Sequence, residues 1–221
     1  MEISPVDRNE AFRYMGFVGR TPNESFLERT DRCEKLLIKA AMPRYTYSVF
    51  RIVRTGKTMF LDGTDFVLEG NDIASHLEGC KSCVLMCCTL SDAVDRLIRV
   101  AQIDGMTDAL ILDALASAAI EQICEKAEIE IRAKYPDKHF TWRFSPGYGD
   151  FPIEAQGKFL DVLFASKRIG VCVNDGGMLT PAKSVTAIIG ISDTELEAKR
   201  SGCAECNLRE NCSFRKNMTH C

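Results

Sequence analysis

The stretch Arg143–Pro152 groups residue types that could bind a small ligand. Pro146-Gly147 is typical of a type II turn, because proline fixes φ at the second position and glycine accepts positive φ at the third. Arg143 offers a planar guanidinium that can donate two hydrogen bonds to a carboxylate. Tyr148 offers an aromatic face to a purine or a sulfonium cation. The combination can therefore hold a ligand with both features, although on spacing alone a plain strand and turn is the more common explanation.

Four cysteines near the C-terminus form a second group with metal-ligand spacing. They are Cys203, Cys206, Cys212 and Cys221, with glycine, asparagine, arginine and lysine around them. Such polar surroundings exclude a packed apolar core, whereas thiolates on short loops suit tetrahedral zinc or an iron–sulfur cluster. We predict a metal site here, with His220 as an alternative to the last cysteine. A tail of reduced thiols is the competing interpretation.

The other cysteines are predicted to be ordinary core residues. Cys80 and Cys83 have metal-like spacing, but residues 83–88 belong to an apolar run whose side chains alternate between two faces. Buried thiols are common in such strands. We expect the same of Cys33, Cys124 and Cys172, and the odd total of eleven cysteines argues against a secreted disulfide scaffold.

Composition restricts the class of protein. Hydrophobic residues make up 46% and charged residues 27% of 221 residues, as expected of a globular chain, and the net charge of -3 argues against nucleic-acid binding. No apolar run is long enough to predict a membrane helix, and the charged N-terminus lacks a signal-peptide core. We therefore expect a cytoplasmic protein with neither a nucleic-acid nor a membrane partner.

Hydrophobic periodicity predicts mixed helices and strands. Helices are expected over residues 6–16, 22–41, 71–77, 91–102, 106–134 and 153–165. Strands are expected over residues 45–53, 57–60, 65–68, 83–89, 139–144, 169–173 and 184–191. Thr21-Pro22 is expected to open the second helix, and Asp150 to cap the helix at 153. The elements do not alternate strictly, so we predict an α+β fold.

Two segments, Arg143–Pro152 and Leu179–Thr186, give the chain a family resemblance. Over residues 10–192 it resembles the activation domain of cobalamin-dependent methionine synthase, in the stand-alone form of some bacteria. Residues 63–68, 76–79 and 113–121 support the match. The resemblance implies a curved antiparallel sheet packed with helices. The order of the expected elements itself predicts a helical N-terminal arm (1–42), a ligand-binding body (43–198) and a cysteine-rich, metal-binding tail (199–221).

The resemblance also implies a function. Members bind S-adenosylmethionine in a shallow groove and dock on the corrinoid of a partner, here a corrinoid protein or a truncated methionine synthase. After cobalt has been oxidised to cob(II)alamin, an electron from flavodoxin or ferredoxin and a methyl group from S-adenosylmethionine restore methylcobalamin. An iron–sulfur cluster on the tail could relay that electron. The alternative is a non-catalytic module that binds S-adenosylmethionine or a corrinoid and carries a metal-binding tail.

Particular residues take family roles by their place in the motifs. The resemblance assigns Arg143 to the ligand's carboxylate and Glu121 to its ammonium group. The full set implied for the cofactor is Arg143, Pro146, Gly147, Tyr148, Glu121, Asp137, Ser184 and Val185. Asp137 stands where the family has a glutamate. After Tyr148 the better-known members carry a different sequence from Gly149–Glu154, and a family tyrosine that follows the second motif has no counterpart here.

Overall fold

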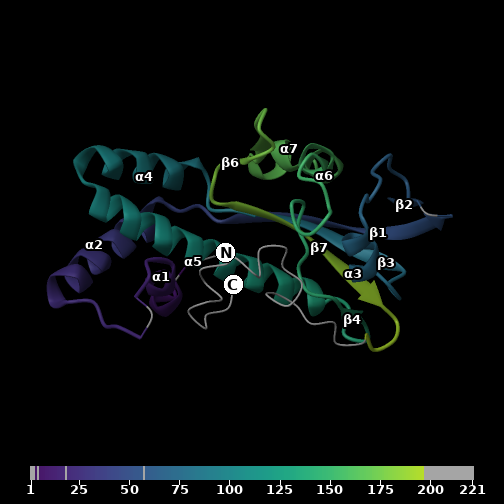
Figure 1. Ribbon diagram of the computed structural model, residues 1–221, viewed down its shortest axis with the longest axis horizontal. Helices are drawn as coiled ribbons and strands as arrows, with labels where there is room; N and C mark the ends of the chain where they lie inside the picture. The colour runs from purple at the N-terminus through teal and green to yellow at the C-terminus, as the bar shows by residue number, and fades with distance from the viewer. Residues whose placement is uncertain (1–2, 4, 18, 57, 197–221) are drawn as a thin grey trace. The chain divides into compact units, whose positions relative to one another are not determined.

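The computed structural model describes residue 3 and residues 5–17, 19–56 and 58–196 (Figure 1). The helices are α1 Arg8–Tyr14, α2 Glu24–Ala40, α3 Asn71–His76, α4 Asp92–Asp104, α5 Met106–Arg132, α6 Ala155–Leu163 and α7 Ala165–Ile169. The strands are β1 Arg44–Thr55, β2 Thr58–Leu61, β3 Ser82–Thr89, β4 His139–Phe140, β5 Cys172–Val173, β6 Leu179–Thr180 and β7 Ser184–Ser192. None of the helices in these ranges is both long and apolar enough to span a bilayer.

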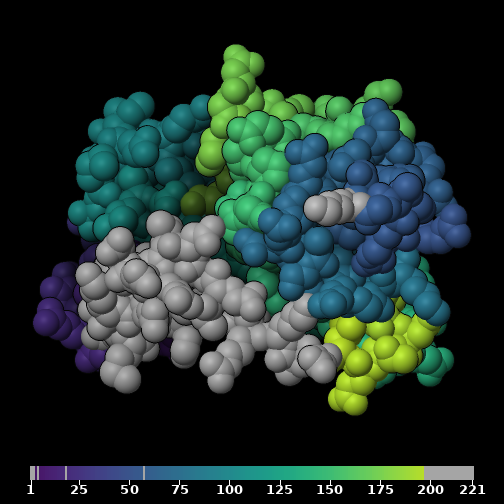
Figure 2. All heavy atoms as spheres, turned by 45° about the vertical axis from the view of Figure 1, so that its right-hand side comes forward, coloured from purple at the N-terminus to yellow at the C-terminus, as the bar shows by residue number. Residues whose placement is uncertain are grey.

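The principal sheet has five strands in the order β2-β1-β3-β7-β4, and β5 and β6 form a separate pair. Strand β1 is antiparallel to β2, with Val53 opposite Phe60, and β4 is antiparallel to β7, with His139 opposite Ser192. The hairpin of β1 and β2 lies at the surface on the right of Figure 2, where β2 is an edge strand. Helices mixed with an open antiparallel sheet confirm the predicted α+β class.

The two central strands are buried almost throughout. Every residue from Cys83 to Thr89 in β3 and from Thr186 to Ser192 in β7 is inaccessible or nearly so. Burial on both faces explains why these segments have continuous apolar runs rather than alternating patterns. This is also why periodicity located both strands to within a residue or two.

The chain divides into two compact units that interleave along the sequence. Among the described residues, the first unit lies within 3–46, 88–131 and 166–185, and the second lies within 47–87, 132–165 and 186–196. In the first unit α5 buries thirteen side chains, many of them alanines, which allow close packing of helices. The buried aromatics of the second unit include Phe66 and Phe159, whose ring centroids lie 6.2 Å apart. The expected boundaries at 42/43 and 198/199 stay predictions.

Several element ends differ from the sequence expectation because side chains cap or interrupt the backbone. Helix α2 begins after Asn23, whose Oδ1 accepts from the Phe26 N–H at 3.0 Å, so Thr21 is not its cap. Residues 65–68 contribute a single bridge, Phe60 to Val67, rather than a strand. The helix expected over 153–165 ends at Leu163, because Phe164 adopts a left-handed conformation with φ 53°.

Strand β4 is shorter than predicted because a side chain takes the place of a backbone acceptor. The Thr141 hydroxyl accepts from the Gly190 N–H at 2.7 Å, a bond that a carbonyl would otherwise make. Pairing resumes only at the isolated bridge between Phe144 and Ile188. The strand expected over 169–173 is likewise reduced to Cys172–Val173, since Ile169 ends helix α7.

Candidate functional site

The loop after β4 has the turn that its sequence predicts. The Tyr148 N–H donates to the Ser145 carbonyl at 3.0 Å, and Gly147 at the third position has φ +90°. Two further bonds close the loop: the Gly147 N–H donates to the Phe151 carbonyl at 2.8 Å, and the Phe151 N–H donates to the Tyr148 carbonyl at 3.0 Å. The predicted Pro-Gly turn is therefore confirmed.

The base of this loop is fastened to strand β7 and to the core. The Ser145 hydroxyl donates to the Thr186 carbonyl at 2.7 Å, and Phe144 exchanges two backbone hydrogen bonds with Ile188 at 2.9 and 2.7 Å. Pro146 is buried and Phe151 is 1% exposed. The loop therefore has a fixed base, and its exposed tip consists of residues 147–149.

A second attachment joins the loop to helix α3. Asp150 accepts from the backbone N–H groups of Asn71 at 2.7 Å and Asp72 at 2.9 Å. These bonds, led by the one from Asp72, hold the pKa of the Asp150 carboxyl below its usual value. The expectation that Asp150 caps the helix at 153 is wrong: Asp150 caps α3, and Glu154 occupies the N-cap position of α6. The acceptor that α3 needs comes from a distant loop because Gly70, at its N-cap position, has no side chain.

Aromatic rings support the tip from below. The ring of Tyr148, half of whose surface is exposed, meets Phe144 edge-on at 5.8 Å. Phe144 in turn stacks on His76 at 4.9 Å and lies 5.4 Å from Trp142. The Thr141 hydroxyl and the His76 Nε2 are 2.8 Å apart, which ties this cluster to the end of β4. A half-exposed aromatic ring supported in this way suits contact with a flat or cationic ligand.

Asp137 is another predicted ligand residue of the second unit, and it precedes the loop in the sequence. It is exposed and stands in a turn closed by the Lys138 N–H and the Tyr135 carbonyl at 3.1 Å. Arg143, immediately before the turn, is half-buried. The ligand roles of both residues stay predictions.

A pocket of about 450 Å³ lies in the first unit and collects a different part of the predicted set. Glu121 from α5 and Ser184 from β7 both line it, whereas Val185 does not. Lys183 also lines this pocket, and its Nζ lies 2.8 Å from Asp113 Oδ1 and 2.9 Å from Ser117 Oγ. Lys183 is only 14% exposed, so its charge is offset locally by the Asp113 carboxylate.

The phenol of Tyr14 completes this pocket. Burial chiefly, with help from Glu10 and Glu121, raises the pKa of Tyr14 to about 12, so the phenol stays neutral and polar. Sequence reasoning missed Tyr14 and the Lys183–Asp113 pair. The sequence signal that could have indicated Lys183 was its position inside the motif Leu179–Thr186. Nothing in the spacing of Tyr14 relates it to α5.

The predicted residues therefore divide between two places. Arg143, Pro146, Gly147 and Tyr148 form the loop of the second unit, which also contains Asp137. Glu121, Ser184 and Val185 belong to the first unit, the first two of them in its pocket. Cys203, Cys206, Cys212 and Cys221 lie outside the described residues, and the described part of the chain contains no group of three His, Cys, Asp or Glu side chains placed to hold a metal.

The described cysteines are buried with one exception. Cys33, Cys80, Cys83, Cys87, Cys88 and Cys124 are buried, as predicted. Burial raises the pKa of Cys33 to about 11 and also raises that of Cys83, so neither thiol is an activated nucleophile. The expectation for Cys172 is wrong: it is exposed, because the β5–β6 pair is only two residues long and covers little surface.

Comparison with known proteins bears on the fold. No family model and no curated protein matches the sequence. Among solved structures, the chain is similar to the crystal structure of the MetH reactivation domain bound to AdoHcy, at 14% identity and a TM-score of 0.66. The likeness covers 97% of this chain and 82% of that one. The protein therefore has the fold of the MetH reactivation domain, as its sequence motifs predicted.

Proposed function

We propose that the protein binds S-adenosylmethionine and supports the reductive methylation of a partner's corrinoid. The observation that carries the proposal is the Arg143–Tyr148 loop, which holds an exposed aromatic ring and an arginine around a fixed turn. The shared fold with a reactivation domain whose structure contains AdoHcy supports it.

Each loop residue would recognise a different part of this ligand. The guanidinium of Arg143 would bind the carboxylate, with charge-assisted hydrogen bonds that are stronger than neutral ones. The face of Tyr148 would contact the sulfonium or the purine. The family resemblance assigns Glu121 to the ligand's ammonium group, and this role stays a prediction because Glu121 lies in the pocket of the first unit. Backbone groups at Gly147 can approach the ligand closely because no side chain intervenes.

The chemistry assigns the protein a positioning role. S-adenosylmethionine would supply an electrophilic methyl group and leave as S-adenosylhomocysteine, and the reduced cobalt of the partner would supply the electron pair for the new bond to that methyl group. The residues of this chain therefore need only hold the ligand in line with the cobalt, and no general base is needed. Little turnover is expected from the chain alone.

The proposal extends to the tail. We propose that Cys203, Cys206, Cys212 and Cys221 bind zinc or an iron–sulfur cluster, since their spacing suits thiolate ligation. Metal analysis after anaerobic purification would measure this directly. About one metal site per chain, lost in a Cys203→Ser, Cys206→Ser double variant, would support it, and metal-free wild-type protein would contradict it.

Reconstitution tests the catalytic part of the proposal. The full chain would be mixed with the cobalamin domain of a methionine synthase, S-adenosylmethionine and a low-potential reductant, and the spectrum of the corrinoid followed. The expected result is conversion of cob(II)alamin to methylcobalamin only when all components are present. Ligand binding without methylation would favour the non-catalytic module instead.

A further inference from the structure

Two short segments, Gly70–Asp72 and Gly149–Asp150, form a reciprocal contact that we call the Asp72–Asp150 clasp. Asp150 accepts three hydrogen bonds: from the N–H of Asn71 at 2.7 Å, from its Nδ2 at 3.1 Å and from the N–H of Asp72 at 2.9 Å. Asp72 returns the contact, since its Oδ2 accepts from the Asp150 N–H at 2.9 Å. Each aspartate thus binds the backbone of the other.

The clasp requires the two glycines that flank it. A Cβ added to Gly149 would lie 2.0 Å from Asp72 Oδ2, and one added to Gly70 would lie 2.5 Å from Asp150 Oδ1. Both glycines also have positive φ, +54° and +123°, which disfavours any side chain there. The close approach of the two backbones therefore depends on glycine at both positions.

The clasp holds the C-terminal end of the Arg143–Tyr148 loop, whereas Ser145 holds its N-terminal end. Ser145 fastens the start of the turn to β7, and Asp150 fastens the residue two positions after Tyr148 to α3. Both ends of the exposed tip are thereby held. A binding loop that is ordered before its ligand arrives avoids the entropic cost of being ordered on binding.

We infer that Asp150 is a positioning residue that, with Asp72, preorders the Arg143–Tyr148 loop for its ligand. This inference rests on the proposed function for the identity of the ligand. Asp150 acts through the backbone of the loop and makes no ligand contact itself. One segment of the clasp, Gly149–Asp150, follows Tyr148 directly.

The experiment compares Asp150→Ala, Asp72→Ala and Asp150→Asn with the wild-type full chain. Hydrogen–deuterium exchange of residues 143–152 would be measured without ligand, and calorimetry with S-adenosylmethionine would measure affinity. Asn23→Ala is the matched control, because it also removes a side-chain cap, that of α2 in the first unit. Either alanine variant should speed exchange in the loop about tenfold and weaken binding about tenfold.

The conservative variant separates positioning from general destabilisation. Asp150→Asn keeps one oxygen that can accept from an α3 N–H, so its affinity should fall between those of wild type and Asp150→Ala. The control should lower thermal stability and leave affinity within about twofold. If wild type binds and the alanine variants bind equally well, the inference is overturned while the proposed function stands.

Failure of the proposed function has a different signature. If wild type does not bind S-adenosylmethionine, that function is refuted, and exchange in the loop then decides the inference alone. Faster exchange in both alanine variants would still support a loop ordered by the clasp. Unchanged exchange would overturn it.

Discussion

At the scale of single residues, the turn was predictable and its anchoring was not. Proline at 146 fixes its own φ and glycine at 147 accepts the positive φ that a type II turn needs, so local sequence specifies the bend. The partner of Asp150 lies 78 residues away on α3. This contact forms because Gly70 lies against Asp150 and Gly149 lies against Asp72 in the folded chain. No local sequence pattern encodes that approach. The Lys183–Asp113 pair was missed for the same reason.

Tyr148 provides a direct test at this scale. Its ring is half-exposed and is supported by Phe144, so the proposed contact uses the aromatic face and not the hydroxyl. Tyr148→Ala should weaken S-adenosylmethionine binding by about 1 kcal/mol, whereas Tyr148→Phe should bind nearly as well as wild type. Calorimetry on the two variants distinguishes the outcomes. Equal loss in both would assign the interaction to the hydroxyl.

At the scale of elements, long and strongly patterned segments were predicted well, whereas short ones were predicted unevenly: α3 and β2 lie within a residue of their expected bounds, and β4 and β5 are shorter than expected. The buried runs of β3 and β7 and the 27-residue α5 appeared within about two residues of their expected bounds. Strand β4 was overestimated because the Thr141 hydroxyl replaces a backbone acceptor, which is a tertiary effect. The N-cap of α2 is Asn23 and not the predicted Thr21. Both residue types can cap a helix, so the choice depends on the folded geometry.

The start of α4 contains a strained residue whose replacement should stabilise the protein. Ser91 has φ 78° and ψ 165°, a region that is almost exclusive to glycine. Its Oγ is buried and, among the described residues, has no hydrogen-bond partner. Ser91→Gly should therefore raise the free energy of unfolding by about 1 kcal/mol, after the greater chain entropy of glycine is subtracted. Urea unfolding measures the change.

Ser91→Ala is the matched control for that prediction. Alanine removes the buried hydroxyl but keeps the side chain in the strained conformation, so its gain should be smaller than that of glycine. A loss of stability in Ser91→Gly would show that the serine makes a favourable contact and would contradict the account.

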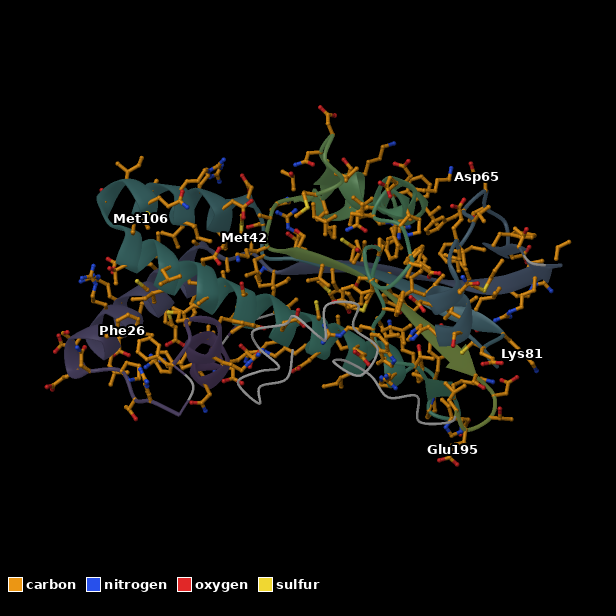
Figure 3. All side chains as sticks on the ribbon, viewed as in Figure 1. Phe26, Met42, Asp65, Lys81, Met106 and Glu195 are labelled. Carbon is orange, nitrogen blue, oxygen red and sulfur yellow. The ribbon has the colours of Figure 1, made fainter. Side chains whose placement is uncertain are left out.

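At the scale of the whole molecule, paired carboxylates in both units link stability to pH. Side-chain cations lower the pKa values of Glu10, Asp65, Asp108 and Asp193, the last to about 2 beside Lys138 and Lys81. Lys81 and Asp65, which are labelled in Figure 3, belong to two of these ion pairs: Lys81 pairs with Asp193, and Asp65 pairs with Lys158. A folded pKa below the unfolded value means that the stabilisation is complete above the unfolded pKa and is lost as pH falls through the folded one.

The free energy of unfolding should accordingly decrease as pH falls from about 5 to 2. Urea unfolding across that range measures it, and Asp193→Asn should flatten the lower end of the curve. Because most of these pairs are exposed, 1 M salt should weaken the dependence. A free energy of unfolding that stays constant over this pH range would contradict a stabilising role for these ion pairs.

The fold of the molecule followed from its two motifs, whereas the ligand roles of the site residues stay predictions. The sequence placed Arg143–Tyr148 on one loop because these residues are neighbours. It could not place Glu121 and Ser184 in one pocket from spacing alone, since α5 and β7 meet there only through tertiary packing. The family resemblance supplied that pair, which shows where local physical reasoning ends.

The central claim is that this loop binds S-adenosylmethionine through Arg143. Calorimetric titration of the full chain, Arg143→Ala and Arg51→Ala tests it most directly. Arg51 is an exposed arginine of β1 paired with Asp62 at 3.0 Å, and so controls for loss of a positive charge. The account predicts binding by wild type and Arg51→Ala, with a loss of about 1.5–3 kcal/mol in Arg143→Ala. No binding by wild type, or equal affinity in all three proteins, would contradict it.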